Sequence, residues 1–451
     1  MFDCRLVRPA AMLLALCALL AVQGCSSIAE GVTRGLTAGS DAKPEPRPCD
    51  ITGAAFEGLS GRLHRLQHSG SALGATNVNE ERLKVMMVHG IGTHPPGYSA
   101  RFQHNLTAAL GLTKRDAQIK EIGLRAPRYF ADEPLGHLRV FRYLNETGSQ
   151  EMLFYELSWS EITNPKKATL AYDTSGEHAY KRSEINHNIK VFLNDRVADS
   201  MAYFGDSNGR ILRSVDAGLC WMAISDWDDL PAKGSPACDG FIFTNPNDFL
   251  EDEFVFVTHS LGSRILADAF RHQVTTLHEW IVGIAKTPKE REGLEKLFDA
   301  MQLKRMRVYM LANQLPLLDM GFPPPEVVGR IDDYCAVDGR DYDDRFLSEL
   351  SIIAFSDPND ALSYALPPGY EERHIDSRLC PSIVNVSVNV ADAIDIFGLS
   401  SFVNPMSAHD SYENDERVIG LMVGGIGFDG TDEKVAAECE WMETVKQTGS
   451  P

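Results

Sequence analysis

"FVFVTHSLGSRILADAF", residues 254 to 270, carries the clearest indication of fold in this sequence. It opens on an unbroken apolar run, Phe254 to Val257, which is typical of a β-strand buried on both faces. It continues with apolar residues at helical spacing from Arg264 onward. Ser260 therefore lies on a turn from a buried strand into a helix. Such a serine is either a nucleophile or part of a simple turn, and the rest of the chain has to distinguish these roles.

Three further apolar runs have the same character. They begin near Val85, Met306 and Leu350, and stretches that favour helix separate them. Alternation of buried strands with helices predicts an α/β protein with a doubly wound, mostly parallel sheet. Ligands of such sheets bind beyond the carboxyl ends of the strands. His89, Ser260 and the residues after Phe355 should meet there.

The connection between the first two of these strands, residues 89 to 253, is much longer than one crossover helix requires. Residues 137–163 indicate two strands joined by a turn near Asn145 to Gly148. Residues 181–205 and 208–224 have helical apolar spacing. We expect a large insertion here, with insert or cap elements within about residues 130–250.

The N-terminus predicts export. Arg5 and Arg8 precede the apolar run "AAMLLALCALLAV", which is too short to span a membrane but suits a signal peptide. The following "VQGCSS" resembles the lipobox of bacterial lipoproteins, although Gln23 is bulkier than usual. The resemblance implies a signal peptide over residues 1–24, lipidation of Cys25 and a periplasm-facing anchor in the outer membrane. A plain secretory signal is the alternative.

The sequence also predicts the organisation that follows the signal. Residues 25–50 are small, polar and proline-containing, which is typical of a flexible tether, and the folded domain should occupy residues 51–451. Cysteines 49, 220, 238, 335, 380 and 439 remain after the lipidated one, so up to three disulfides could form, in unknown pairing.

Charge and motifs exclude some function classes. The net charge of −20 and the lack of any basic run argue against a nucleic-acid partner. The cysteines and histidines show no zinc or redox spacing, so we expect no cofactor and no metal.

The turn around Ser260 matches the nucleophile elbow G-x-S-x-G, with Thr258 in place of the first glycine and Gly262 at the last position. At this point the chain resembles the α/β-hydrolase family, in particular its lipase and esterase members. The resemblance implies a nucleophile, an acid and a histidine in that order along the chain.

Both later members of the triad have candidates. The loop "SDPND" after the last long strand carries Asp357 and Asp360, and we favour Asp360 as the acid, with Asp357 as a turn or cap residue. His409, on the polar segment "NPMSAHDSYEN", is the expected base, and His374 is the alternative.

The resemblance also implies an oxyanion hole made by two backbone N–H groups. One belongs to Leu261, the residue after the nucleophile, and the other to Ile91 in the loop "HGIG". We expect His89 and His259 to be hydrogen-bonding framework residues rather than acid–base groups.

Together these features predict an envelope-anchored serine hydrolase that cleaves carboxylic esters, including lipid esters. A phospholipase, thioesterase or amidase with the same triad remains open, as does a non-catalytic lipoprotein that retains the fold.

Overall fold

The computed structural model describes residues 48–63, 82–115, 119–126, 133–176, 182–224, 226–238, 246–283, 287–392, 394–396, 400–428 and 430–442. Residues from Pro48 onward form one compact unit. The predicted signal peptide, Cys25 and nearly all of the predicted tether lie outside the described residues. No helix among the described residues is long and apolar enough to cross a membrane.

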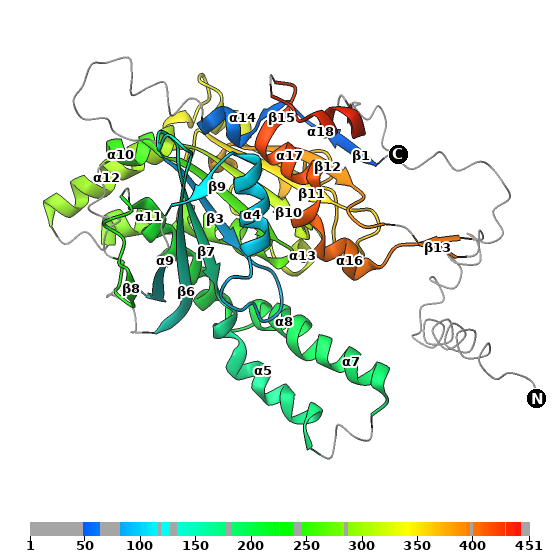
Figure 1. The fold of residues 1–451 in the computed structure, drawn as a ribbon. Coiled ribbons are helices and arrows are strands. Elements are labelled where there is room, and N and C mark those ends of the chain that lie inside the picture. The colour runs from blue at the N-terminus through cyan, green and yellow to red at the C-terminus, as the bar shows by residue number, and fades with distance from the viewer. Residues whose placement is uncertain are drawn as a thin grey trace, which may run out of the picture. The chain divides into compact units, whose positions relative to one another are not determined.

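A 12-stranded mixed sheet runs through the unit (Figure 1). Its strand order is β16 (Cys439–Met442), β1 (Cys49–Thr52), β12 (Pro381–Val388), β11 (Glu349–Ser356), β10 (Arg305–Leu311), β9 (Glu253–His259), β3 (Leu83–Val88), β7 (Glu151–Ser158), β6 (Pro134–Leu144), β5 (Lys120–Arg125) and β8 (Lys233–Gly234), and β4 (Thr113–Lys114) pairs with β6.

The six central strands, β7, β3, β9, β10, β11 and β12, are parallel to one another. Antiparallel pairing is confined to the outer parts, where β6 pairs with β7 and with β5, β4 pairs with β6, and β1 pairs with β12. The prediction of a mostly parallel α/β sheet is confirmed. The four apolar runs form β3, β9, β10 and β11, and the predicted strand pair forms β6 and β7.

Helices pack against both faces of this sheet. β3 is buried along its whole length and presents Met86 and Val88 to one layer, and Val85 and Met87 to the other. The first layer contains α9 (Asn208–Ala223), α11 (Leu261–Gly283) and α12 (Pro288–Leu303), and the second contains α4 (Ala100–Ala109) and α17 (Glu416–Gly424). Because both faces of the strand are covered, the part of β3 from Val85 to Val88 is a continuous apolar run.

Shorter elements complete the unit. Outside the segment between β7 and α9 they include the short helices α10 (Pro246–Glu251), α13 (Leu315–Leu318), α14 (Ile331–Cys335), α15 (Tyr370–His374), α16 (Pro405–Asp410) and α18 (Glu433–Glu438). Two small sheets pair β2 (Phe56–Glu57) with β15 (Gly425–Ile426) and β13 (Ile394–Ile396) with β14 (Ser400–Phe402).

A set of helices between β7 and α9 extends away from the sheet, and we call it the helical arm (Figure 1). It comprises α5 (Asn164–Ala171), α7 (Glu184–Phe192), the π-helical turn η3 (Leu193–Val197) and α8 (Ala198–Phe204). The apolar spacing of residues 181–205 and 208–224 predicts α7, η3, α8 and α9, whereas α5 lies outside both segments and was not predicted.

All six cysteines of the described unit are paired, as Cys49–Cys439, Cys220–Cys238 and Cys335–Cys380. The first bond joins β1 to β16 at one edge of the sheet. The sequence left the pairing open, because the partners lie up to 390 residues apart.

Candidate active site

Ser260 lies where β9 ends and α11 begins. Its φ angle is 54°, in the left-handed region that non-glycine residues rarely adopt. The turn is fixed on both sides, because Ser260 N–H donates to Leu311 O at 3.0 Å and Ser263 Oγ donates to Ser260 O at 2.7 Å. Ser260 is 1 % exposed, and its Oγ has no hydrogen-bond partner among the described residues. Strained backbone and an uncommitted hydroxyl are features of a functional serine.

Close backbone contacts around this turn require glycine at two positions. A Cβ on Gly262 would lie 2.3 Å from Val88 O at the end of β3. A Cβ on Gly90 would lie 2.7 Å from the Cβ of Ser260. Thr258, by contrast, is an inward-packed residue within β9, paired with Val88 and Met310. The position where the motif usually has glycine therefore accommodates a threonine.

His409 and Asp360 are in direct contact. His409 Nδ1 lies 2.8 Å from Asp360 Oδ2, and both side chains are buried. The backbone carbonyl of His409 accepts a hydrogen bond from His259 Nε2 at 2.9 Å, which holds the histidine beside the residue that precedes Ser260. His409 Nε2 is buried without a hydrogen-bond partner in the described part of the chain. The two uncommitted atoms, Ser260 Oγ and His409 Nε2, are those between which a triad transfers its proton.

Several contacts keep Asp360 ionised. Burial disfavours its charged form, but the hydrogen bond and the charge of His409 outweigh burial and hold the pKa of the Asp360 carboxyl below its usual value. Leu362 N–H also donates to Asp360 Oδ1 at 2.9 Å. Tyr412 OH lies 3.4 Å from Oδ2 and accepts from Asp357 N–H at 2.6 Å. An ionised carboxylate on Nδ1 favours the imidazole tautomer with a free Nε2.

The alternatives for acid and base have other partners. Asp357 accepts hydrogen bonds from the N–H groups of Asn359 at 2.7 Å and Val390 at 2.8 Å, as expected of a turn residue. His374 Nδ1 lies 3.4 Å from Asp319, and the ring stacks on Tyr370.

His89 and His259 are framework residues, as the sequence predicts. Trp159 N–H donates to His89 Nε2 at 3.2 Å, so Nδ1 carries the proton and donates to Gly90 O at 2.8 Å. Burial lowers the pKa of His89 well below its usual value, and burial together with the nearby His409 lowers the pKa of His259 to about 3. Both rings therefore stay neutral at ordinary pH.

The predicted oxyanion loop follows β3 directly, and β3 is hydrogen-bonded to β9, so Ile91 and Leu261 both follow the carboxyl ends of adjacent strands. Leu261 is the first residue of α11, and N–H groups in a first helical turn have no acceptor within the helix. Gly92, with φ 104°, donates its N–H to Asp199 Oδ2 at 2.7 Å. The N–H of Gly92 is thus occupied, which leaves Ile91 as the candidate donor from this loop.

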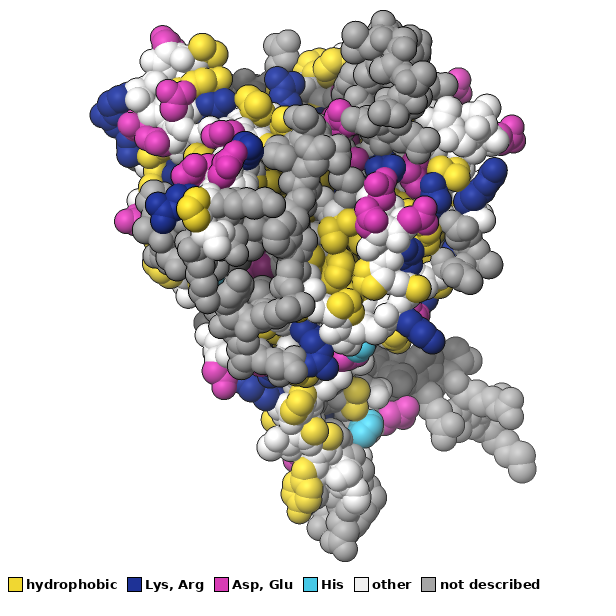
Figure 2. All heavy atoms as spheres, turned by 90° about the vertical axis from the view of Figure 1, so that its left-hand side faces the viewer, with side chains coloured by type: hydrophobic (Ala, Val, Ile, Leu, Met, Phe, Trp, Pro, Cys, Tyr) yellow, Lys and Arg dark blue, Asp and Glu magenta, His cyan; other side chains and the backbone are white. Residues whose placement is uncertain are grey.

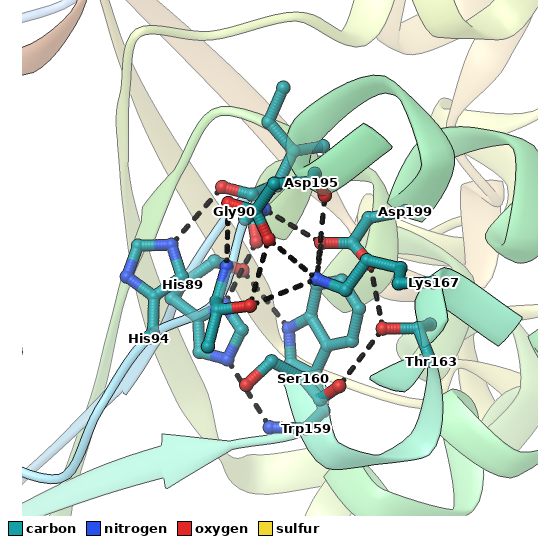
Figure 3. A network of polar contacts seen from close by, with 12 residues as sticks. His89, Gly90, His94, Trp159, Ser160, Thr163, Lys167, Asp195 and Asp199 are labelled. Carbon is teal, nitrogen blue, oxygen red and sulfur yellow. Dashed lines mark hydrogen bonds and ion pairs between the residues drawn. The ribbon is translucent and has the colours of Figure 1, made fainter. Parts of the chain in front are cut away.

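Residues of the helical arm contact this loop (Figure 3). No sequence motif predicted that they would be part of the site. Lys167 Nζ lies between Asp195 and Asp199, 3.1 Å from an oxygen of each. Asp195 accepts from Thr93 Oγ1 at 2.8 Å and from Thr93 N–H at 3.3 Å. Only the spacing of the two aspartates, one helical turn apart, hints in the sequence at a shared face.

One group of side chains near Ser260 has the composition of a metal site. His259, His409 and Asp410 offer ligand atoms that all lie within 4.8 Å of one another. However, His259 Nε2 is engaged with the carbonyl of His409, and His409 Nδ1 with Asp360. These hydrogen bonds suit a proton relay better than a cation site.

Searches against protein-family models, curated proteins and solved structures found no match to this chain.

Proposed function

We propose that this chain is a serine hydrolase that cleaves carboxylic esters through an acyl-enzyme on Ser260. The observation that carries the proposal is the buried Asp360–His409 hydrogen bond, with an uncommitted imidazole nitrogen on His409 and an uncommitted hydroxyl on Ser260. The strained turn of Ser260 follows His259, which is hydrogen-bonded to His409. This set provides a nucleophile, a base and an acid that orients the base.

The reaction follows from the roles of these groups. His409 Nε2 takes the proton of Ser260 as Oγ attacks the carbonyl carbon of the ester, and the N–H groups of Ile91 and Leu261 stabilise the developing oxyanion. The imidazolium then protonates the departing alcohol. Water, activated by the same imidazole, cleaves the acyl-enzyme and releases the acid. Asp360 stays ionised and stabilises the imidazolium in both halves of the reaction.

We propose an α/β-hydrolase fold in which the segment between β3 and β9, including the helical arm, is an insertion beside the site. The adjacency of β3 and β9 supports this, because it brings the HGIG loop and the Ser260 turn to the same edge of the sheet.

Lipid esters are the favoured substrates within this class. The arm exposes large apolar side chains, which Figure 2 shows on the part of the molecule that projects at the bottom of the view. They are Leu170, Ile189, Val191, Leu193, Met201 and Phe204, and the exposed Tyr172 directly follows α5. Exposed apolar surface of this kind next to a site is typical of contact with an apolar ligand or lipid surface.

We also propose that the protein is anchored in the bacterial cell envelope through Cys25. The pairing of all six cysteines in the described part of the chain supports an oxidising compartment such as the periplasm. Replacement of Cys25 by serine should abolish incorporation of labelled fatty acid and move the protein from the membrane to the soluble fraction. Unchanged fatty-acid labelling would contradict the anchor.

The decisive experiment compares wild type with Ser260→Ala. Hydrolysis of p-nitrophenyl butyrate should fall by about 10⁴- to 10⁶-fold, and labelling by a fluorophosphonate probe should disappear. Ser382→Ala, which changes an exposed serine of β12, is the control and should behave as wild type. Persistent labelling of Ser260→Ala would refute the assignment, and an inert wild type across ester, thioester, amide and phospholipid substrates would favour a non-catalytic lipoprotein.

A further inference from the structure

We infer that Asp199, supported by Lys167, is a positioning residue that fixes the oxyanion loop, residues 90–93, from the helical arm. The inference rests on the proposed function and adds to it, because residues of the helical arm would then position the loop that carries the Ile91 N–H.

Asp199 is fully buried and directly engaged with the loop. Its Oδ2 accepts the Gly92 N–H at 2.7 Å, and its Oδ1 accepts Thr163 Oγ1 at 2.6 Å. Lys167 Nζ lies 3.1 Å from Oδ2 and compensates the charge. Hydrogen bonds to a charged acceptor are shorter and roughly twice as strong as neutral ones. The position of Gly92 is therefore set by a carboxylate on α8.

The next loop residue is held by the same helical run. Asp195, one turn earlier, receives both the N–H and the hydroxyl of Thr93, and Lys167 Nζ lies 3.2 Å from that hydroxyl (Figure 3). Asp195 belongs to η3, and π-helical turns inside helices occur frequently at functional sites. Two consecutive loop residues thus have their N–H groups bound by two carboxylates that share one lysine.

The loop depends on these contacts because the sheet does not extend into it. β3 ends at Val88, and Gly92 adopts a left-handed φ that sheet pairing does not stabilise. The Ile91 carbonyl and the Gly92 N–H belong to one peptide group, which His94 Nε2, 3.2 Å from the carbonyl, and Asp199 hold at both polar atoms. The peptide that carries the Ile91 N–H is held at its other end, because Gly90 O accepts from His89 Nδ1. Small displacements of an oxyanion donor raise the barrier of the reaction far more than they weaken substrate binding.

Asp199→Asn is the direct test. An amide keeps the size of the side chain but removes the negative charge, so its oxygen binds the Gly92 N–H more weakly and Lys167 loses its buried counter-ion. With p-nitrophenyl butyrate, kcat should fall by about 10- to 100-fold while KM changes by less than about threefold. Inhibition by an alkyl boronic acid, which mimics the tetrahedral oxyanion, should weaken by a similar factor.

A second buried lysine–aspartate pair provides the matched control. Lys84 Nζ lies 2.6 Å from Asp252 Oδ2, and these side chains are 0 % and 2 % exposed. The pair sits at the amino end of β3 and β9, at the opposite end of the strands from Ser260. Asp252→Asn should lower stability to a similar extent as Asp199→Asn, yet leave kcat and boronate affinity of the folded enzyme unchanged.

Asp195→Asn covers the case in which Asp199→Asn does not fold, because Asp195 is 40 % exposed and tolerates replacement more readily. It should lower kcat by about 3- to 10-fold with little change in KM. Wild-type kcat in the folded Asp199→Asn and Asp195→Asn proteins, or equal kcat losses in Asp252→Asn, would overturn the positioning role. An inactive wild type would instead contradict the proposed function, so the two failures are distinguishable.

Discussion

The backbone strain at Ser260 agrees with the nucleophilic role that we propose for this residue. A left-handed conformation costs a non-glycine residue about 1–3 kcal/mol, and it persists here because β9, α11 and Leu311 O fix both sides of the turn. The sequence predicted this serine, Asp360 and His409, since each lies directly after a recognisable strand or in a short motif with a known chain order. It did not predict Asp199 or Lys167, because their roles arise only from contacts between distant segments.

Asp360 and Asp357 differ in what their carboxylates bind, and this difference predicts their mutant phenotypes. Asp360→Asn removes the charge that stabilises the His409 imidazolium and should lower kcat by about 10³- to 10⁴-fold. Asp357→Asn affects a carboxylate bound to Asn359 and Val390 and should lower kcat less than tenfold. Steady-state kinetics of the purified variants decide the matter, and a larger loss in Asp357→Asn would reverse the assignment of the acid.

The pKa of His259 predicts how stability depends on pH. Burial and the neighbouring His409 lower this pKa to about 3 from a usual value of 6.5. Between these values the unfolded chain binds the proton more readily than the folded one, so stability falls as the pH falls, by up to about 1.4 kcal/mol per pH unit from this group.

His259→Gln tests this dependence. Glutamine retains an amide donor for the carbonyl of His409 but does not titrate. Urea unfolding between pH 7 and pH 4 should therefore show a flatter decline in the free energy of unfolding for His259→Gln than for wild type. Parallel declines would mean that His259 takes up its proton in the folded state as easily as in the unfolded state.

Strands and helices were predictable from the sequence where the spacing of apolar residues fits only one kind of secondary structure. A short run such as Val85 to Val88 indicates a strand because both faces of β3 are covered by helices. Within the long segment between β3 and β9, the apolar spacing predicted α7, α8 and α9, but it did not predict α4, α5 or α10. What the helices of the arm do was not predictable, because amphipathic spacing indicates which face is buried and not what that face contacts.

Because α11 packs closely on β3, adding one methyl group at Gly262 should lower both stability and activity. Gly262→Ala would place a Cβ 2.3 Å from Val88 O, and backbone cannot move aside as a side chain can. The helix must shift, which should cost about 1–3 kcal/mol of stability and lower kcat by at least about tenfold, since Ser260 and Leu261 move with it.

Gly209→Ala in α9 is the control for helix propensity. Its Cβ would have Arg213 Nη1, the end of a flexible side chain, at 3.5 Å as its nearest neighbour. Alanine is favoured over glycine in a helix by about 1 kcal/mol, so this variant should be as stable as wild type or more stable, with unchanged kcat. Thermal melts with kinetics compare the variants, and a fully active Gly262→Ala would contradict the close contact at the elbow.

The disulfides connect the architecture of the whole unit to the compartment we propose. The N-terminal residues predict export, and the six remaining cysteines were compatible with pairing. The Cys49–Cys439 pair was not predictable, because it depends on the sheet order that brings β1 beside β16. Cys49 and Cys439 thereby join the two ends of the described chain.

The number of residues between the paired cysteines predicts that the Cys49–Cys439 disulfide contributes most to stability. In the chain-entropy model, closing a loop of 390 residues stabilises by about 6 kcal/mol, whereas the separation of 18 residues between Cys220 and Cys238 gives about 3 kcal/mol. The double variant Cys49→Ala/Cys439→Ala should therefore lose about twice as much free energy of unfolding as Cys220→Ala/Cys238→Ala, measured in urea without reductant. Alanine is chosen because Cys49 is fully buried and a serine hydroxyl there would add its own cost. Equal losses, or a larger loss in the short-loop variant, would mean that local packing around each bond outweighs the restriction of the unfolded chain.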